Sequence, residues 1–274
     1  MPADFIARAV LGRSHAVIGM VHVPPLPGTP RAADSVDAIV RQCVQEARLL
    51  ADGGVDAVMI ENMHDVPYVI GPMGPEIVAA MTAVACGVRQ AVSCPLGVQI
   101  LAAGNREALS VALASAAAFV RVEGFVYAHV ADEGLMPVAQ AGDLLRYRRA
   151  IGATQVAVWA DIKKKHASHA LTADVDLAET AATAEFFGAD ALVVTGLATG
   201  RPTAPDDLQA ARDASRLPVV VGSGTTPENL EAQWPVADAF IVGSYIKREG
   251  LWSNPPDPAR LRRFMERVGV LRGV

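Results

Sequence analysis

The sequence predicts a (β/α)8 barrel, because apolar runs typical of strands alternate with amphipathic helical stretches along the chain. Eight such runs can be counted, and their apolar side chains are typical of strands buried on both faces of a parallel sheet. The last two runs each end in a glycine loop, within 218–224 and 240–244. An open doubly wound sheet would alternate in the same way, but its glycine fingerprint normally opens the first unit, whereas GSGTTP lies in the seventh. The barrel is therefore the preferred prediction.

Each predicted strand is followed by a connection long enough for a helix. We expect strands at 16–22, 57–62, 96–101, 119–123, 155–163, 191–195, 218–221 and 239–242. Helical patterns cover 35–52, 75–91, 106–117, 174–187 and 227–233. No Pro/Gly/Ser-rich linker divides the chain, so we expect residues 1–274 to form one barrel domain, with 1–15 as an N-terminal extension.

Composition limits the class of protein and its partners. Hydrophobic residues make up 51% of the chain and charged ones 19%, which is enough for a large core. A net charge of -5 gives no support for a nucleic-acid polymer as partner. No apolar run is long enough to span a membrane, and three cysteines suit a reducing compartment, so we expect a cytoplasmic protein. Soluble barrels often associate, and a homo-oligomer is expected.

The two glycine loops predict a phosphate site. Glycine leaves room for an anion to approach backbone N–H groups, and serine can donate a further hydrogen bond. The loops after the seventh and eighth strands are also where (β/α)8 barrels usually bind phosphate. The expected phosphate-binding residues are Gly222, Ser223, Gly224, Gly243 and Ser244. The alternative is that these glycines serve only as tight turns.

Polar residues gather where the other predicted strands end. Alternation places Arg121 and Glu123 on one face of the fourth strand, and Asp161 and Lys163 on one face of the fifth. Because the carboxyl ends of all strands meet at the barrel mouth, these side chains are expected to converge there. The expected substrate-binding residues are Asn62, Gln99, Arg121, Glu123, Lys165, His166 and Thr195.

Four residues at or near the ends of predicted strands are candidates for catalysis: His22, Glu61, Asp161 and Lys163. Asp161 would keep Lys163 charged and oriented, while Lys164 is expected to face outward. Glu61 would act as a general base, hold Mg2+ together with Asp161, or form an ion pair with Lys163 or Arg121. Residue types alone leave the metal undecided.

Three segments carry a resemblance to a known family. IGMVHVPPLPGTP, GVDAVMIENMHDVPY and WADIKKKHASH resemble the BtpA family, also called BtpA/SgcQ and named for a factor needed for photosystem I accumulation. The resemblance implies a TIM barrel of the ribulose-phosphate-binding type, with a poorly defined activity. The motif positions are His22, Glu61, Asn62, Asp65, Asp161, Lys163, Lys165 and His166.

Two classes of function follow from these observations. The first is an enzyme that acts by acid/base chemistry on a phosphorylated small molecule, a sugar phosphate or nucleotide, as an isomerase, lyase or hydrolase. The second is a non-catalytic assembly or regulatory factor, related to photosystem I biogenesis, that keeps the barrel mouth as a vestigial or sensing ligand site. A mouth blocked by its own side chains, or a large exposed apolar patch, would favour the second.

Overall fold

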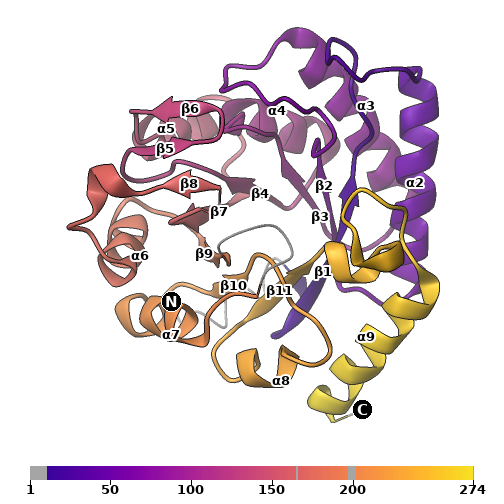
Figure 1. Cartoon of the computed structure of the whole chain (residues 1–274). Helices are drawn as coiled ribbons and strands as arrows, with labels where there is room; N and C mark the ends of the chain where they lie inside the picture. Colours follow the sequence, from indigo (N-terminus) through magenta and orange to yellow (C-terminus); the bar gives the residue numbers. More distant parts are fainter. Residues whose placement is uncertain (1–10, 165, 197–201, 274) are drawn as a thin grey trace.

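The computed structural model describes residues 11–164, 166–196 and 202–273, and its central feature is a closed barrel of eight parallel strands (Figure 1). Around the barrel the strands follow the order β1, β2, β3, β4, β7, β9, β10 and β11, and β11 pairs with β1. Their bounds are Ala16–His22, Ala57–Glu61, Leu96–Gln99, Phe119–Val122, Ala157–Ile162, Ala191–Val194, Val219–Val221 and Ala239–Val242. The predicted (β/α)8 barrel is confirmed.

Helices surround the barrel; they lie in the connections between strands, except for the last one, which follows β11 (Figure 1). They are α2 (Val36–Asp52), α3 (Pro75–Ala91), α4 (Asn105–Ser115), α5 (Ala141–Ala150), α6 (Leu177–Phe186), α7 (Pro205–Ala214), α8 (Leu230–Gln233) and α9 (Pro258–Arg272). Ser35 precedes α2 as its N-cap, with its side chain accepting from the Ala38 amide. No helix of the described chain is long and apolar enough to cross a membrane.

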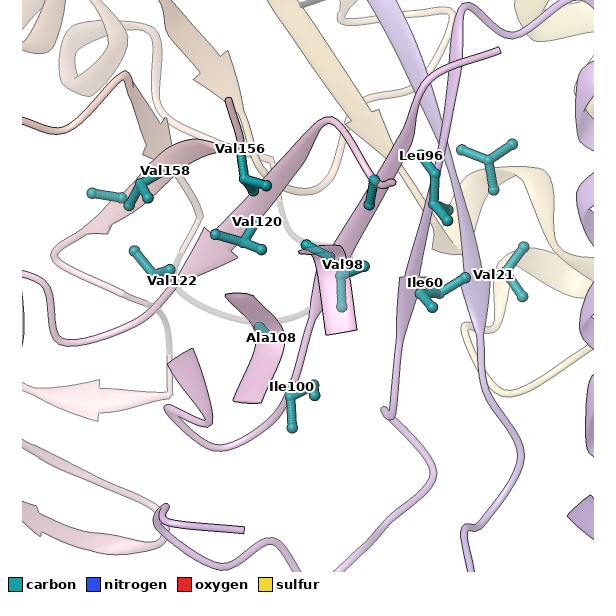
Figure 2. Packing of buried hydrophobic residues seen from close by; sticks show 14 of the residues in the cluster. Val21, Ile60, Leu96, Val98, Ile100, Ala108, Val120, Val122, Val156 and Val158 are labelled. Atoms are coloured by element: carbon teal, nitrogen blue, oxygen red, sulfur yellow. The ribbon is translucent and has the colours of Figure 1, made fainter. Parts of the chain in front are cut away.

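Strand alternation divides the apolar core into two clusters. Val120 and Val122 of β4 point outward to the larger cluster between sheet and helices, which Figure 2 shows in part. Phe119 of the same strand points inward and stacks on Trp159 of β7, with ring centroids 3.9 Å apart. Leu11 belongs to this inner cluster. Of the expected extension, residues 1–10 lie outside the described part of the chain.

A small antiparallel sheet, absent from the predictions, follows the fourth barrel strand. β5 (His129–Ala131) pairs with both β6 (Gly134–Met136) and β8 (Ala167–Ser168). Each strand has three residues or fewer, which is too short for a period of two to stand out in the sequence. This sheet brings the connection after β4 beside the connection after β7 (Figure 1).

A buried ion pair fixes the segment that follows β11. Two short 3-10 helices, η2 (Ser244–Ile246) and η3 (Arg248–Gly250), flank Lys247. The Lys247 side chain is 1% exposed, and its Nζ donates to Glu46 Oε2 of α2 at 2.8 Å. Burial lowers the pKa of Lys247, although Glu46 opposes the shift. The pair anchors this segment to α2 through Lys247, which lies three residues after Ser244.

Candidate active site

A cavity of about 280 Å³ opens at the carboxyl ends of the strands. Inward alternation brings Gln99, Arg121 and Asp161 to it from β3, β4 and β7. Both glycine loops and several strand-end side chains line the same cavity. The predicted residues that it brings together are His22, Glu61, Gln99, Arg121, Glu123, Asp161, His166, Gly222, Ser223, Gly224, Gly243 and Ser244.

Arg121 and Asp161 form the central ion pair of the cavity. Arg121 Nε donates to both carboxylate oxygens of Asp161 at 3.1 Å, and Nη2 donates to Oδ1 at 3.0 Å. Burial alone would lower the pKa of Arg121, but Asp161 and Glu61 raise it above its usual range. A guanidinium held by a carboxylate remains charged and keeps a fixed orientation in the mouth.

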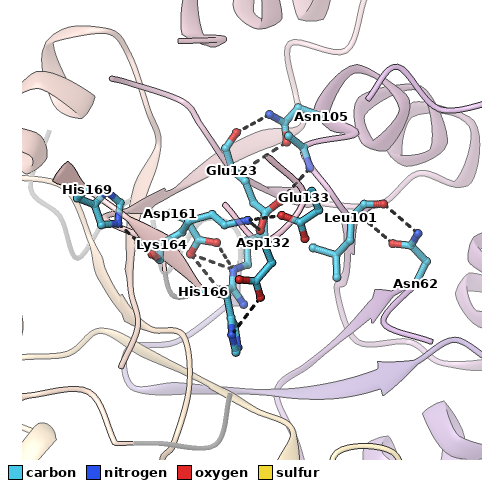
Figure 3. A network of polar contacts seen from close by, with 12 residues as sticks. Asn62, Leu101, Asn105, Glu123, Asp132, Glu133, Asp161, Lys164, His166 and His169 are labelled. Carbon is cyan, nitrogen blue, oxygen red and sulfur yellow. Dashed lines mark hydrogen bonds and ion pairs between the residues drawn. The ribbon is translucent and has the colours of Figure 1, made fainter. Parts of the chain in front are cut away.

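A second ion pair joins Lys164 to Glu123 (Figure 3). Lys164 Nζ donates to Glu123 Oε1 at 2.9 Å, while the Ala103 amide donates to Glu123 Oε2 at 2.9 Å. Asn105 accepts from the Glu123 amide and donates to its carbonyl oxygen, which fixes the backbone here. Although burial opposes both shifts, the pairing lowers the pKa of Glu123 and raises that of Lys164.

The expectation that Lys163 faces the mouth and Lys164 faces outward is wrong. β7 ends at Ile162, and Lys163 has a φ of 45°, so the period of two stops before the lysines. Lys163 Nζ donates to the carbonyl oxygen of Val175, and Lys164 takes the place beside Asp161 in the cavity. The left-handed backbone conformation of Lys163 therefore turns its own side chain away from this cavity and directs the Lys164 side chain into it.

Two predicted substrate-binding residues do not line this cavity, and a third cannot be placed. Asn62 is buried, and its side-chain amide donates to the Leu101 carbonyl oxygen and accepts from the Leu101 amide (Figure 3). It also donates to Asp65 Oδ2. Thr195 lies behind Gly222, where its methyl group would be 2.7 Å from an added Cβ. Lys165 lies outside the described residues.

His22 and Glu61 form the third polar group of the mouth. His22 Nδ1 donates to the carbonyl oxygen of Trp252 at 2.8 Å. In the neutral ring this places the lone pair on Nε2, which lies 3.9 Å from Glu61 Oε2. An imidazole fixed in this way can accept a proton from a ligand in the cavity.

The glycine loops approach the cavity with their backbone. A Cβ on Gly222 would lie 2.6 Å from the Val193 side chain, so only glycine fits without a shift. A Cβ on Gly243 would lie 3.3 Å from the His22 ring. Ser223 Oγ accepts from the Gly196 amide, and Gly224 has a φ of 71°, a left-handed conformation that favours glycine.

The residues do not fit a Mg2+ site at Glu61 and Asp161, which was one of the alternatives that the sequence left open. Both carboxylate oxygens of Asp161 accept hydrogen bonds from Arg121. Among the described residues no group of three or more His, Cys, Asp or Glu side chains could hold a metal ion. We therefore derive no step through a metal.

Comparison with known proteins identifies the family. The model of the BtpA family matches residues 13–269. The chain belongs to the BtpA family. An uncharacterized mitochondrial protein of Caenorhabditis elegans is 43% identical, over 93% of this chain and 94% of its own. The photosystem I biogenesis protein BtpA of Synechocystis is 36% identical, over 91% of this chain and 86% of its own.

Solved structures share the fold of this BtpA-family chain. Thiamine phosphate pyrophosphorylase from Pyrococcus furiosus has a TM-score of 0.59 at 14% identity, over 96% of this chain and 98% of its own. Phosphoribosyl anthranilate isomerase from Thermus thermophilus has a TM-score of 0.55 at 15% identity, over 94% of this chain and 100% of its own. At these identities the likeness shows the barrel fold alone.

Sequence reasoning missed nine residues that line the cavity of this BtpA-family barrel. Six come from connecting segments: Met63, Tyr68, Leu101, Asp132, Glu133 and Trp252. Met20 and Ile241 could have been found from strand alternation, since Met20 lies two residues before His22 and Ile241 two residues before Gly243. The ninth residue is Lys164. DEG at 132–134 was an available signal for a hairpin beside the mouth.

His129 lies beside Lys164, next to a second, much smaller cavity. Burial, Lys164 and His169 lower its pKa from 6.5 to about 4. Because the folded protein binds this proton less tightly than the unfolded chain, His129 makes folding less favourable as the pH falls from 6.5 toward 4. This destabilisation disappears at pH values well above 6.5, the pKa of the histidine in the unfolded chain.

We predict that His129→Gln reduces the loss of stability between pH 7 and pH 5. The difference should be on the order of 1 kcal/mol, because solvent screens part of the interaction. Urea unfolding at both pH values measures it. An unchanged loss in the variant would show that His129 does not carry this pH dependence.

Proposed function

We propose that this protein is an enzyme that acts by acid/base chemistry on a phosphorylated small molecule, a sugar phosphate or nucleotide. One observation carries the proposal. The same cavity is lined by the glycine loops after β10 and β11 and by His22, Glu61, Asp161 and Lys164. A phosphate at the loops would hold the rest of the substrate within reach of these groups.

Each polar group has a role in this proposal. Backbone N–H groups of the two glycine loops bind the phosphate. His22, with its lone pair on Nε2, accepts a proton, and Lys164 takes the role that the sequence suggested for Lys163, donating to negative charge that develops on the substrate. Arg121 and Asp161 orient the reacting end. The reaction would be isomerisation, lyase cleavage or hydrolysis.

Two further observations support the proposal that the protein is an enzyme. The names of the compared barrel structures include a phosphate pyrophosphorylase and a phosphoribosyl isomerase, so this fold accommodates phosphorylated substrates in other proteins. The cavity is also open rather than filled by its own side chains, in contrast to the feature that would favour an assembly factor. We place the enzyme in the cytoplasm as a homo-oligomer, and light scattering measures its oligomeric state.

We predict that Gly243→Val weakens binding of glucose 6-phosphate by about ten- to a hundredfold, which corresponds to loss of about 1.5–3 kcal/mol from a hydrogen bond to a charged group. The added side chain would stand between the backbone and the phosphate, starting 3.3 Å from the His22 ring. Calorimetric titration of wild type and variant measures the change.

Glucose is the control ligand, and its affinity should be the same in both proteins. Circular dichroism confirms that the variant is folded. Equal weakening of glucose and glucose 6-phosphate would show that the loop serves only as a turn.

A further inference from the structure

Among the described residues that line the cavity, carboxylates outnumber lysine and arginine side chains. The carboxylates are Glu61, Glu123, Asp132, Glu133 and Asp161. The lysine and arginine side chains of that same described lining are Lys164 and Arg121. A bound phosphate would add further negative charge, so a phosphate ester that also carries a positive charge should bind more favourably here than one with negative charge alone.

Three of these carboxylates, Glu123, Asp132 and Glu133, come from the side of the barrel opposite the glycine loops. β10 and β11 are neighbours in the closed sheet, and β3 and β4 lie across the barrel from them. Gln99 belongs to β3, Glu123 follows β4, and Glu133 lies in the hairpin after β4. A ligand whose phosphate is bound at the loops would therefore direct its other end toward this acidic side.

Two acceptor atoms on the acidic side are buried without a hydrogen-bond donor from the described residues. They are Gln99 Oε1 and Glu133 Oε2. Gln99 is 2% exposed and the Glu133 side chain 9%. Glu133 Oε2 is 3.9 Å from Lys164 Nζ, too far for a hydrogen bond. Buried acceptors normally have a donor, so both atoms indicate donors supplied by a ligand.

Tyr68 lies close to several carboxylates at this side of the cavity. Its ring lines the cavity, and its hydroxyl donates to the Met63 carbonyl oxygen at 2.7 Å. Burial and then the charges of Glu61 and Glu133 raise the pKa of Tyr68 above its usual range. The side chain is therefore a neutral aromatic face, and such a face attracts cations.

We propose that the acidic side of the cavity, between Tyr68, Gln99 and Glu133, binds a positively charged nitrogen group of the substrate. The inference rests on the proposed function and narrows its substrate class to phosphate esters that carry a basic nitrogen. A protonated amine supplies the donors that Gln99 Oε1 and Glu133 Oε2 lack and balances the excess of carboxylates. A hydroxyl would supply a donor but no charge.

Matched sugar phosphates test this inference. Glucosamine 6-phosphate and glucose 6-phosphate differ in one group, an amine or a hydroxyl at the far end from the phosphate. At pH 7 we expect the amino sugar phosphate to bind wild type at least about tenfold more tightly. If it binds no more tightly than glucose 6-phosphate, the inference is wrong.

Single substitutions test whether Glu133 causes the preference for the amino sugar phosphate. Glu133→Gln keeps the shape and removes the charge, and should bring the ratio of the two affinities close to one. Asp132→Asn makes the same kind of change on the same hairpin, but the Asp132 side chain is 74% exposed, so the ratio should remain. A preference that survives in Glu133→Gln, or disappears equally in Asp132→Asn, contradicts the assignment. If Glu133→Gln does not fold, Gln99→Met should lower the preference instead.

Unphosphorylated glucosamine separates the two proposals. If it binds as tightly as glucosamine 6-phosphate and loses affinity in Glu133→Gln, the cation site stands and the phosphate site of the proposed function fails. If both phosphorylated sugars bind equally and much more tightly than glucose and glucosamine, the phosphate site stands and the cation site fails.

Discussion

Replacing Lys164 by Met should lower the free energy of unfolding by about 3–5 kcal/mol, the cost typical of breaking a buried ion pair. The Lys164 and Glu123 side chains are 7% and 9% exposed, so the variant would leave a buried carboxylate without its cation. Turnover should fall by roughly a hundredfold or more, since Lys164 lines the cavity. Urea unfolding and steady-state rates measure the two effects.

The neighbouring lysine is the matched control. Lys163→Met removes a donor to a single carbonyl oxygen and should cost about 1 kcal/mol or less, with turnover unchanged. The double variant Lys164→Met/Glu123→Gln also removes the stranded charge and should recover part of the stability, but none of the turnover. A larger loss of turnover from Lys163→Met would restore the role suggested by the sequence.

Lys247→Met should also lower the free energy of unfolding by about 3–5 kcal/mol. Its ammonium group is buried against the Glu46 carboxylate, and the variant leaves that carboxylate without its cation. Because Lys247 follows Ser244 by three residues, release of this anchor should also weaken phosphate binding at the loop. Urea unfolding and titration with inorganic phosphate test the two expectations.

Arg248→Met is the control for this variant. Arg248 is exposed, so its replacement should change stability by about 0.5 kcal/mol or less. Adding Glu46→Leu to Lys247→Met removes the unpaired carboxylate and should recover much of the stability. Equal effects of the two single variants would show that the pair does not anchor this segment.

The fold could be predicted because most residues of each barrel strand are apolar. β1 and β11 have the predicted bounds, while β3 is two residues shorter than predicted at its carboxyl end. The residues that end the strands, such as His22 and Gln99, could be assigned to the mouth because alternation continues up to that point.

The other site residues come from connecting segments, whose sequences show no periodic pattern of apolar and polar residues. Lys163 shows the limit, since one left-handed backbone conformation exchanges its direction with that of Lys164. Tyr68 and Trp252 reach the cavity from long connecting segments, where no alternation indicates direction. Asn62 shows a different limit: β2 ends one residue earlier than predicted, at Glu61, and the Asn62 amide forms its hydrogen bonds within the protein.

The stacked rings of Phe119 and Trp159 have a consequence for the movement of water and protons. The rings lie at an interplanar angle of 13° in the barrel interior, and the apolar side chains of Leu11, Ile18 and Val220 pack in the same cluster. Among the described residues this cluster closes the barrel below the cavity. In the proposed reaction, we therefore expect protons to exchange with solvent at the rim, where Asp132 Oδ2 and His166 Nδ1 are 3.7 Å apart. Solvent isotope exchange should then respond to changes at that rim and remain insensitive to changes in the apolar cluster.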